Sequence, residues 1–310
     1  MLKNTPMFRK TFTNYIETLQ DTICTELEKL DGKARFREDL WKRDGGGGGR
    51  TRVIENGALF EKGGVNVSAV HGELPELIKN HFKTDHGTFW AGGISLVIHP
   101  ESPMVPTVHA NFRYFELFGN SGNSAPVDAW FGGGADLTPY YLREDDAIHF
   151  HKTLKTTCDR HGSDLYPRFK KQCDDYFFNT HRGEARGIGG LFFDYLKQNE
   201  QKSLQQWFDF TTDAGSAFLP AYLPIVEKRM QESWSAEQRE WQEIRRGRYV
   251  EFNLIHDRGT LFGLKTNGRI ESILMSLPPK VRWDYNVQPL PGSPEAELTE
   301  VLKNPREWVS

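Results

Sequence analysis

The sequence predicts an α+β fold built on mostly antiparallel strands, and three observations carry this prediction. Strand-like segments follow one another from Val53 onward with short turns between them. Asn267-Gly268 is the two-residue sequence typical of a tight hairpin, which joins antiparallel strands. Segments with apolar residues at helical spacing stand before and after the strands. The 310 residues, 37% of them hydrophobic, can form a sizeable core in one large domain or two.

The composition excludes several classes of protein. The formal charge of −3 comes from interspersed acids and bases without a basic block, which argues against a nucleic-acid partner. No apolar run reaches the roughly 20 residues that span a membrane, and the mean hydropathy is −0.61. Cys24, Cys158 and Cys173 lack the number and spacing of a disulfide framework or a zinc ribbon. The N-terminus has no apolar signal segment, so we expect a mature cytoplasmic protein or, alternatively, a processed organellar one.

The first elements are a long helix and a glycine run. Apolar residues from Phe12 to Leu30 recur at helical spacing, so this helix packs against a core. Gly45 to Gly49 and Arg50 then lack the Lys-Ser/Thr of a phosphate-binding loop. We expect a mobile loop here. The functional alternative is a lid whose Arg50 closes over an anionic ligand.

Two strands with alternating side chains follow. Over 93–99, Ser95 and His99 share one face, and over 108–115, His109, Asn111 and Arg113 share one face. The link between the strands is short, so an antiparallel pair would bring these polar groups together. A solvated sheet face is the plain alternative, although histidine, asparagine and arginine beside large aromatics are less typical of it than lysine and glutamate.

The central stretch, Trp130 to His151, delivers one acid, Asp136, after three glycines that allow close backbone approach. This carboxylate is a candidate catalytic group, or alternatively a turn or helix-capping residue. In the helix expected over 145–161, His151 faces inward and His149 outward. An inward histidine is either a ligand or a hydrogen-bonded core residue.

Further helices are expected from Pro167 to Thr180, with His181 at the edge of the apolar face, and over 203–230 and 235–246. Between them, Arg182 and Arg186 stand among glycines, a setting that suits a carboxylate or phosphate ligand. Strands over 248–256, 261–266 and 269–277 are expected as a β-meander, and a short helix ends the chain.

Five long motifs in order make the resemblance to a known family specific. They are GGGGGRTRVIENGALFEKGGVN, FWAGGISLVIHPESPMVPTVHANFRYFE, WFGGGADLTPYYL, DLYPRFKKQCDDYFFNTHRGEARGIGGLFFDYL and RYVEFNLIHDRGTLFGLKTNGRIESILMSLPP. The chain resembles the oxygen-dependent coproporphyrinogen III oxidases. The resemblance implies a single domain over 1–310, with a large, mostly antiparallel sheet flanked by helices on both faces, and a homodimer.

The resemblance also implies a reaction, oxidative decarboxylation of two propionates of coproporphyrinogen III to vinyl groups, which yields protoporphyrinogen IX for haem biosynthesis. O2 is the co-substrate, no organic cofactor takes part, and a divalent metal stays an open possibility. By resemblance, the catalytic residues are His109, Arg113, Asp136 and Arg186. The implied substrate contacts are Ser95, Asn111, Phe112, Arg113, Asn267, Gly268 and Arg269. The histidines proposed as metal ligands in bacterial members correspond to His99, His109, His151 and His181.

The chemistry suggests roles for these groups. The arginines Arg113, Arg186 and Arg269 would bind propionates, and Asp136 would face the pyrrole NH groups as positive charge develops there. Two rival hypotheses differ in kind. One is a non-haem iron oxygenase using His99, His109 and Asp136, which would lose its activity on chelation of the metal. The other is a tetrapyrrole carrier that catalyses no reaction and would therefore show no oxygen uptake with the substrate.

Overall fold

The computed structural model describes residues 5–74, 76, 79, 87–119, 125–265 and 268–309. Its centre is a seven-stranded sheet in the order β1-β2-β3-β4-β5-β6-β9, in which every neighbouring pair is antiparallel. The strands are β1 (Arg37–Lys42), β2 (Gly47–Glu55), β3 (Phe60–Glu73), β4 (Thr88–Pro100), β5 (Thr107–Phe118), β6 (Asp128–Thr138) and β9 (Gly190–Leu196). A separate small hairpin pairs β7 (Phe178–Asn179) with β8 (Glu184–Ala185).

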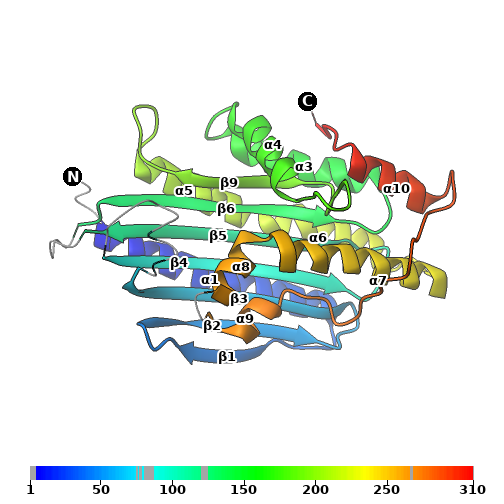
Figure 1. Cartoon of the computed structure of the whole chain (residues 1–310), viewed down its shortest axis with the longest axis horizontal. Coiled ribbons are helices and arrows are strands. Elements are labelled where there is room, and N and C mark those ends of the chain that lie inside the picture. Colours follow the sequence, from blue (N-terminus) through cyan, green and yellow to red (C-terminus); the bar gives the residue numbers. More distant parts are fainter. Residues whose placement is uncertain are drawn as a thin grey trace.

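Helices cover both faces of this sheet, which confirms the predicted fold class (Figure 1). α1 (Thr5–Asp31), α5 (Leu204–Ser216) and α6 (Phe218–Arg229) lie behind it in that view. α7 (Ala236–Glu251), η1 (Phe252–His256), α8 (Arg258–Lys265) and α9 (Ile270–Leu274) lie on the other side. α3 (Glu144–Asp159), α4 (Leu165–Tyr176) and α10 (Pro294–Lys303) pack near β9 and the C-terminal end. Among the described residues, every helix is too short or too polar to cross a membrane.

The main core lies between the sheet and α1, and the predicted helical stripe and strand faces form it. Phe12 and Ile16 of α1 are fully buried, as are Ile98 and Val108 of the sheet. The predicted alternation in β4 and β5 is confirmed. One face of each strand packs against α1, and the polar residues predicted to share a face lie on the opposite one.

The predicted β-meander over 248–277 is wrong, because most of the described residues of this region are helical. α7 begins with a capping box, in which Ser235 and Gln238 satisfy each other's backbone N–H groups. The helix runs on to Glu251 and widens into the π-helix η1, after which α8 and α9 follow. Tyr249 and Phe252 are buried by this packing. Tertiary contacts on a helical face therefore override a local pattern that also fits a strand.

The loop and lid expected over Gly45 to Arg50 are wrong for Gly47 to Arg50, whereas Gly45 and Gly46 do lie in the turn before β2. Gly47 to Gly49 and Arg50 belong to β2, which pairs with β1 and β3. A Cβ atom at Gly49 would lie 2.3 Å from the Trp41 ring, so the strand needs glycine at this position. Arg50 donates to Gln20 at 2.5 Å and Asp21 at 2.8 Å, which fixes its side chain against α1.

Asp31, the last residue of α1, connects this helix to the turn between β2 and β3. Its carboxylate accepts hydrogen bonds from the backbone N–H groups of Lys33, Ala34, Ala58, Leu59 and Phe60 at 2.8–3.2 Å. Burial alone would raise the pKa of Asp31, but these donors outweigh it, and the pKa lies below its usual value.

Asp31→Ala should lower the free energy of unfolding by about 3 kcal/mol at pH 7, because it leaves buried N–H groups without an acceptor. A carboxyl group with a lowered folded pKa stabilises the fold above its unfolded pKa of about 3.9 and loses that contribution as the pH falls. Urea unfolding at pH 7 and at pH 3 measures both effects, and the loss should shrink at pH 3. Asp164→Ala, at a helix N-cap without a side-chain cap bond, is the control; an equal loss in both variants would contradict the role of Asp31.

Candidate active site

The polar face predicted for β4 and β5 is present and extends over neighbouring strands. Asn66 of β3 lies opposite Ser95 of β4, and Ser95 lies opposite Asn111 of β5. His109 of β5 lies opposite Asp136 of β6 in the same way. The helices α7, η1, α8 and α9 lie over this face (Figure 1), since Thr51, which bonds to Asn66, also bonds to Ser272 of α9. The antiparallel register therefore brings together residues that are up to 70 positions apart in the chain.

Asp136, His109 and Arg186 form the centre of this face. The Arg186 guanidinium donates to both Asp136 oxygens, at 2.9 and 2.8 Å, and also to Asn253 Oδ1 at 2.8 Å. His109 Nδ1 lies 2.8 Å from Asp136 Oδ1. Because the carboxylate can only accept, we assign the Nδ1 proton to His109, which leaves Nε2 free to exchange a proton. The His109 side chain is 20% exposed and that of Asp136 is 1% exposed.

Aromatic rings enclose the Arg186 charge. Its guanidinium carbon lies 4.1 Å from the ring centroid of Phe177, 4.5 Å from that of Tyr249 and 4.9 Å from that of Phe252. Burial would raise the pKa of Asp136, but the Arg186 charge and the bond from His109 lower it below its usual value. Asp136 is therefore ionised although it is buried, and the Arg186 cation balances its charge.

This geometry corrects two expected roles. Asp136 is neither a turn nor a capping residue, since it lies inside β6. Its Oδ1 accepts from His109 and Arg186 and its Oδ2 from Arg186, and the contact with the substrate proposed from the sequence stays a prediction. Arg186 is 3% exposed, and its Nη1 and Nη2 are engaged by Asn253 and Asp136, so it is not open to a propionate. Asp136 bonds to His109, whose side chain is partly exposed on the polar face.

Arg113 remains available to an anion, because its side chain is 36% exposed. Its Nη1 donates to Asn111 Oδ1 at 3.0 Å. Phe112, between these two residues, points to the opposite face and is buried in the core with α1, so only its backbone belongs to the polar face. Ser95 is half-buried beside Asn111.

The expected contacts near 267–269 lie at the other end of this face. Asn267 is outside the described residues, and Gly268 donates its backbone N–H to Gly263. Arg269 pairs with Asp39 of β1. Thr51 of β2 bonds to Asn66 at 2.8 Å, which continues the polar row toward this region. A cavity of about 430 Å³ between β1–β3 and α9 includes Thr51 and Arg269 among its lining residues.

His99 is buried in a chain of hydrogen bonds. Its Nε2 lies 2.9 Å from the Ser276 carbonyl oxygen, which can only accept, so Nε2 carries the proton. Its Nδ1 then accepts from Thr107, at 3.2 Å, and the Tyr140 hydroxyl lies 2.6 Å from Thr107 Oγ1. Burial lowers the pKa of His99 well below its usual value. Both ring nitrogens are occupied within the fold.

His151 is inward-facing as predicted, and it is a hydrogen-bonded core residue. Its Nε2 donates to the Ile188 carbonyl at 3.0 Å, and its Nδ1 accepts from the Tyr166 hydroxyl at 2.9 Å. The indole N–H of Trp308 bonds to the same Ile188 carbonyl, at 3.1 Å. Ile188 follows Arg186 in the same loop, so these contacts hold that loop in place.

His181 is exposed and contacts His256 and Glu251, at 2.9 and 2.8 Å. Burial would raise the pKa of Glu251, but bonds from Arg182 and His181 lower it to about 2. Arg182, expected to bind an anionic ligand, is therefore paired with Glu251. In the described ranges no group of three or more His, Cys, Asp or Glu side chains could hold a metal ion. The structure does not bring the four histidines together, and they do not fit a shared metal site.

Sequence reasoning missed the groups that α7, η1 and α8 contribute. Asn253 and Tyr249 contact Arg186, and Asp257 accepts from Tyr176 at 2.9 Å. The guanidinium of exposed Arg258 lies 4.7 Å from the Tyr176 ring. Because the sequence pattern predicts strands over 248–277, these residues are not expected at the site. The Ser235–Gln238 capping box marks the start of a helix, and continuing that helix past residue 246 would have placed them there.

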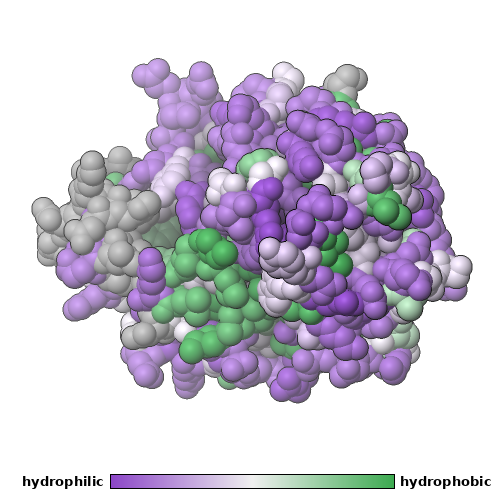
Figure 2. Space-filling view, turned by 45° about the vertical axis from the view of Figure 1, so that its right-hand side comes forward, coloured by the Kyte–Doolittle hydropathy of each residue, from purple (hydrophilic) through white to green (hydrophobic). Residues whose placement is uncertain are grey.

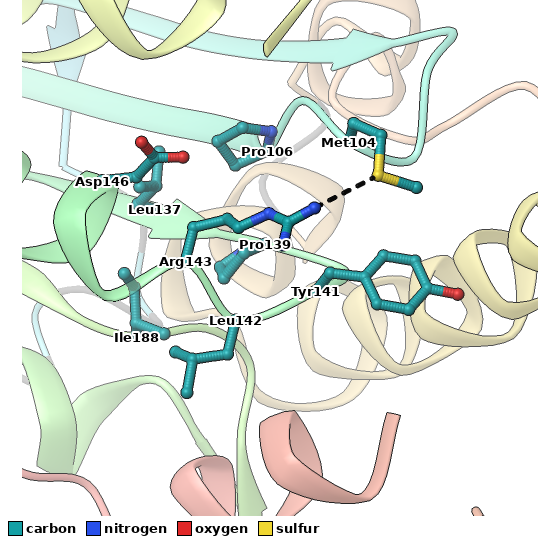
Figure 3. A pocket seen from close by; sticks show the side chains of 9 residues that line it. All are labelled: Met104, Pro106, Leu137, Pro139, Tyr141, Leu142, Arg143, Asp146 and Ile188. Atoms are coloured by element: carbon teal, nitrogen blue, oxygen red, sulfur yellow. Dashed lines mark hydrogen bonds between the residues drawn. The ribbon is translucent and has the colours of Figure 1, made fainter. Parts of the chain in front are cut away.

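A small pocket has Leu137, Pro139 and Ile188 among its lining residues (Figure 3). Arg143 reaches across it toward the Met104 sulfur, at 3.9 Å. Its volume of about 10 Å³ admits a molecule no larger than water. A substrate with several carboxylates therefore belongs on the polar face and not here.

A partly exposed histidine, bonded to a buried acid–arginine pair and beside a more exposed arginine, is an arrangement typical of enzyme sites that transfer protons. Residues 11–308 match the family described as Coproporphyrinogen III oxidase. The chain belongs to the coproporphyrinogen III oxidase family, and so to the oxidoreductases.

Three relatives illustrate this membership. The oxygen-dependent coproporphyrinogen-III oxidase, chloroplastic, of Glycine max is 50% identical over 309 residues, which cover 97% of this chain and 80% of that protein. The chloroplastic protein of the same name from Nicotiana tabacum is 47% identical over 315 residues, covering 99% and 79%. The mitochondrial one from Homo sapiens is 51% identical over 300 residues, covering 94% and 65%.

His151→Gln should flatten the loss of stability in acid. Burial lowers the pKa of His151 from 6.5 to about 3, so the unfolded chain takes up a proton here that the folded chain refuses. Stability from this residue is complete above pH 6.5 and falls by about 1.4 kcal/mol per pH unit toward pH 3. Urea unfolding between pH 4 and 7 measures the slope, with His149→Gln as the control. An unchanged slope in His151→Gln would show that His151 is protonated in the folded state.

Proposed function

We propose that the chain catalyses the oxygen-dependent oxidative decarboxylation of two propionates of coproporphyrinogen III, giving protoporphyrinogen IX for haem biosynthesis. The family match over residues 11–308 supports the reaction, and the His109–Asp136–Arg186 centre is the observation that carries its location. Each propionate loses CO2 and a hydride equivalent, so O2 accepts two electrons. With O2 reduced to peroxide, each cycle also takes up one proton.

His109 is the group that we propose to exchange this proton. Its Nδ1 is held by Asp136, which fixes the tautomer and leaves Nε2 toward the open side. Arg186 Nη2, which donates to both oxygens of Asp136, holds Asp136 as an anion, so Asp136 is a positioning residue for the imidazole.

Arg113 is the group that we propose to bind a propionate. A planar guanidinium pairs with a carboxylate through parallel N–H donors, and Asn111 already holds one side of it. Ser95 and Asn111 line the floor beside it. Arg258, exposed above Tyr176, supplies a further cation on the helix side. Arg269 is a candidate for a more distant carboxylate, provided that substrate displaces Asp39.

O2 is the oxidant in this proposal, with neither an organic cofactor nor a stoichiometric metal. The electron-rich pyrrole can itself supply the electrons. His99, His151 and His181 each bond to different partners within the fold, so they do not form a shared metal site. Elemental analysis, together with activity after exhaustive chelation, tests this point. One metal per subunit whose removal abolishes activity and whose return restores it would refute the proposal.

A homodimer is the assembly that we propose. Exposed apolar side chains gather on η1, α8 and α9: Leu254, Ile255, Phe262, Leu264 and Ile270. Figure 2 shows an apolar area of this kind on the face that carries these helices. Such a concentration is typical of a protein interface, and β1 adds a sheet edge beside it.

The cytoplasm is the compartment that we propose, supported by three free, buried cysteines that suit a reducing environment. The relatives' names are chloroplastic or mitochondrial, so cell fractionation with an antibody against this chain decides the question.

The test of function is oxygen uptake with coproporphyrinogen III, followed by fluorescence of the product after oxidation. Protoporphyrin with matched oxygen consumption is the expected result. Binding of the substrate without oxygen uptake would instead identify a tetrapyrrole carrier.

His109→Gln should lower kcat at least about 10²-fold, since it removes a positioned acid–base group. His149→Gln is the matched control, because within the described part of the chain the His149 ring bonds to the Pro220 carbonyl on α6, and His149 lies on the other side of its helix from His151. It should keep kcat within about twofold of the parent. Equal losses in both variants would show that His109 has no special part in turnover.

Phe262→Glu should convert the dimer to a monomer, because it places a charge in an apolar interface. Analytical ultracentrifugation measures the mass. Leu290→Glu changes an apolar residue that is 77% exposed outside this surface and should stay dimeric. A parent protein that sediments as a monomer would refute the proposal outright.

A further inference from the structure

Strand β9 contains a bulge at the edge of the polar face. Opposite the single residue Gly132 of β6, β9 has two residues, Asp194 and Tyr195. Tyr195 has a φ of 53°, in the left-handed region that residues other than glycine rarely adopt. Bulges of this kind turn a side chain toward a new direction and occur often beside active sites.

The bulge directs Asp194 toward Arg113 across β6. Asp194 Oδ2 lies 2.9 Å from Arg113 Nη2, and Asp194 Oδ1 accepts the backbone N–H of Tyr195 at 3.0 Å. Arg113 Nη1 meanwhile donates to Asn111 at 3.0 Å. The guanidinium is therefore held from two strands, β5 and β9, that do not pair with each other.

The missing side chain of Gly132 makes this contact possible. A Cβ atom at Gly132 would lie 2.7 Å from Asp194 Oδ1, 2.8 Å from Arg113 Nε and 3.0 Å from Arg113 Nη2. The ion pair thus rests directly on the backbone of β6. Gly132, one of the three glycines of the central sequence motif, is therefore needed for the contact between Asp194 and Arg113.

We propose that Asp194 is a positioning residue for substrate binding, which holds the Arg113 guanidinium against Gly132 so that its remaining N–H groups receive a propionate carboxylate. This inference rests on the proposed function. Arginine has five N–H donors, and Asn111 and Asp194 each engage one nitrogen. Fixing the fork before binding removes the entropy loss that a free arginine side chain would suffer on binding.

Stability gives little reason for this ion pair. The side chains of Arg113 and Asp194 are 36% and 17% exposed, and partly exposed pairs stabilise a fold weakly. A left-handed Tyr195 costs free energy as well. An arrangement that contributes little to folding but orients a cation at the site is typical of a binding function.

Asp194→Asn should raise the KM for coproporphyrinogen III about tenfold, with kcat within about twofold, because the interaction lost acts on binding; tenfold corresponds to about 1.4 kcal/mol. Gly132→Ala should change KM in the same direction by displacing the same pair. Asp159→Asn removes an ion pair of similar length, Lys155–Asp159 at 2.8 Å on α3, and should leave KM unchanged.

A double-mutant cycle separates positioning from a general structural effect. In an Arg113→Lys background, Asp194→Asn should change KM less than about twofold, since the fork that it orients is gone. A full tenfold effect in that background, or an unchanged KM in Asp194→Asn alone, would overturn the inference. A lowered KM would also overturn it, by showing that Asp194 competes with the substrate for Arg113.

Binding of coproporphyrin III keeps this test separate from the test of the reaction. This stable oxidised porphyrin has the same four propionates, and its fluorescence reports affinity without turnover. If the parent binds it but consumes no O2, the proposed reaction fails while a tenfold weaker Asp194→Asn still supports the inference. Equal affinity of the parent and Asp194→Asn refutes the inference whatever the activity.

Discussion

The buried ion pair between Asp136 and Arg186 is the interaction on which the rest of the site depends. Removing two charges from water costs several kcal/mol each, so the pair persists only with excellent geometry and further partners. Arg186 Nη2 and His109 Nδ1 donate to the carboxylate, and Asn253 and the surrounding rings contact the guanidinium. The sheet, the loop at 186 and the helices at 249–253 must therefore all be in place before either charge is satisfied.

The helical layer is itself held to the sheet by charge. Glu61 of β3 accepts from Arg239, at 2.7 and 2.8 Å, and from Arg246 at 2.6 Å, both on α7. Arg246 also donates to the Pro100 carbonyl at the end of β4. Burial would raise the pKa of Glu61, but these arginines lower it. α7 thus has one position over the sheet, and with it Tyr249 and Asn253 have one position over Arg186.

The sequence alone predicts the sheet half of the site well and the helical half poorly. A period of two is visible in any strand, so the common face of His109, Asn111 and Arg113 follows from counting. The residues from 248 onward allow both periods, and only packing against Arg186 and the sheet selects the helix. Asp194 could not be found by counting, because a bulge shifts the alternation at the residue concerned. The pairing of His109 with Asp136 follows from a strand register that composition does not reveal.

The Ile188 carbonyl, which accepts from both His151 and Trp308, links the loop that carries Arg186 to two distant segments of the chain. The neighbouring Arg306 carbonyl accepts from the buried Lys170 at 2.8 Å. During synthesis, which proceeds at roughly 5–20 residues per second, the sheet is complete long before residue 308 is added. The loop that carries Arg186 therefore cannot gain its contact with Trp308 until that residue, far along the chain from Arg186, has been synthesised.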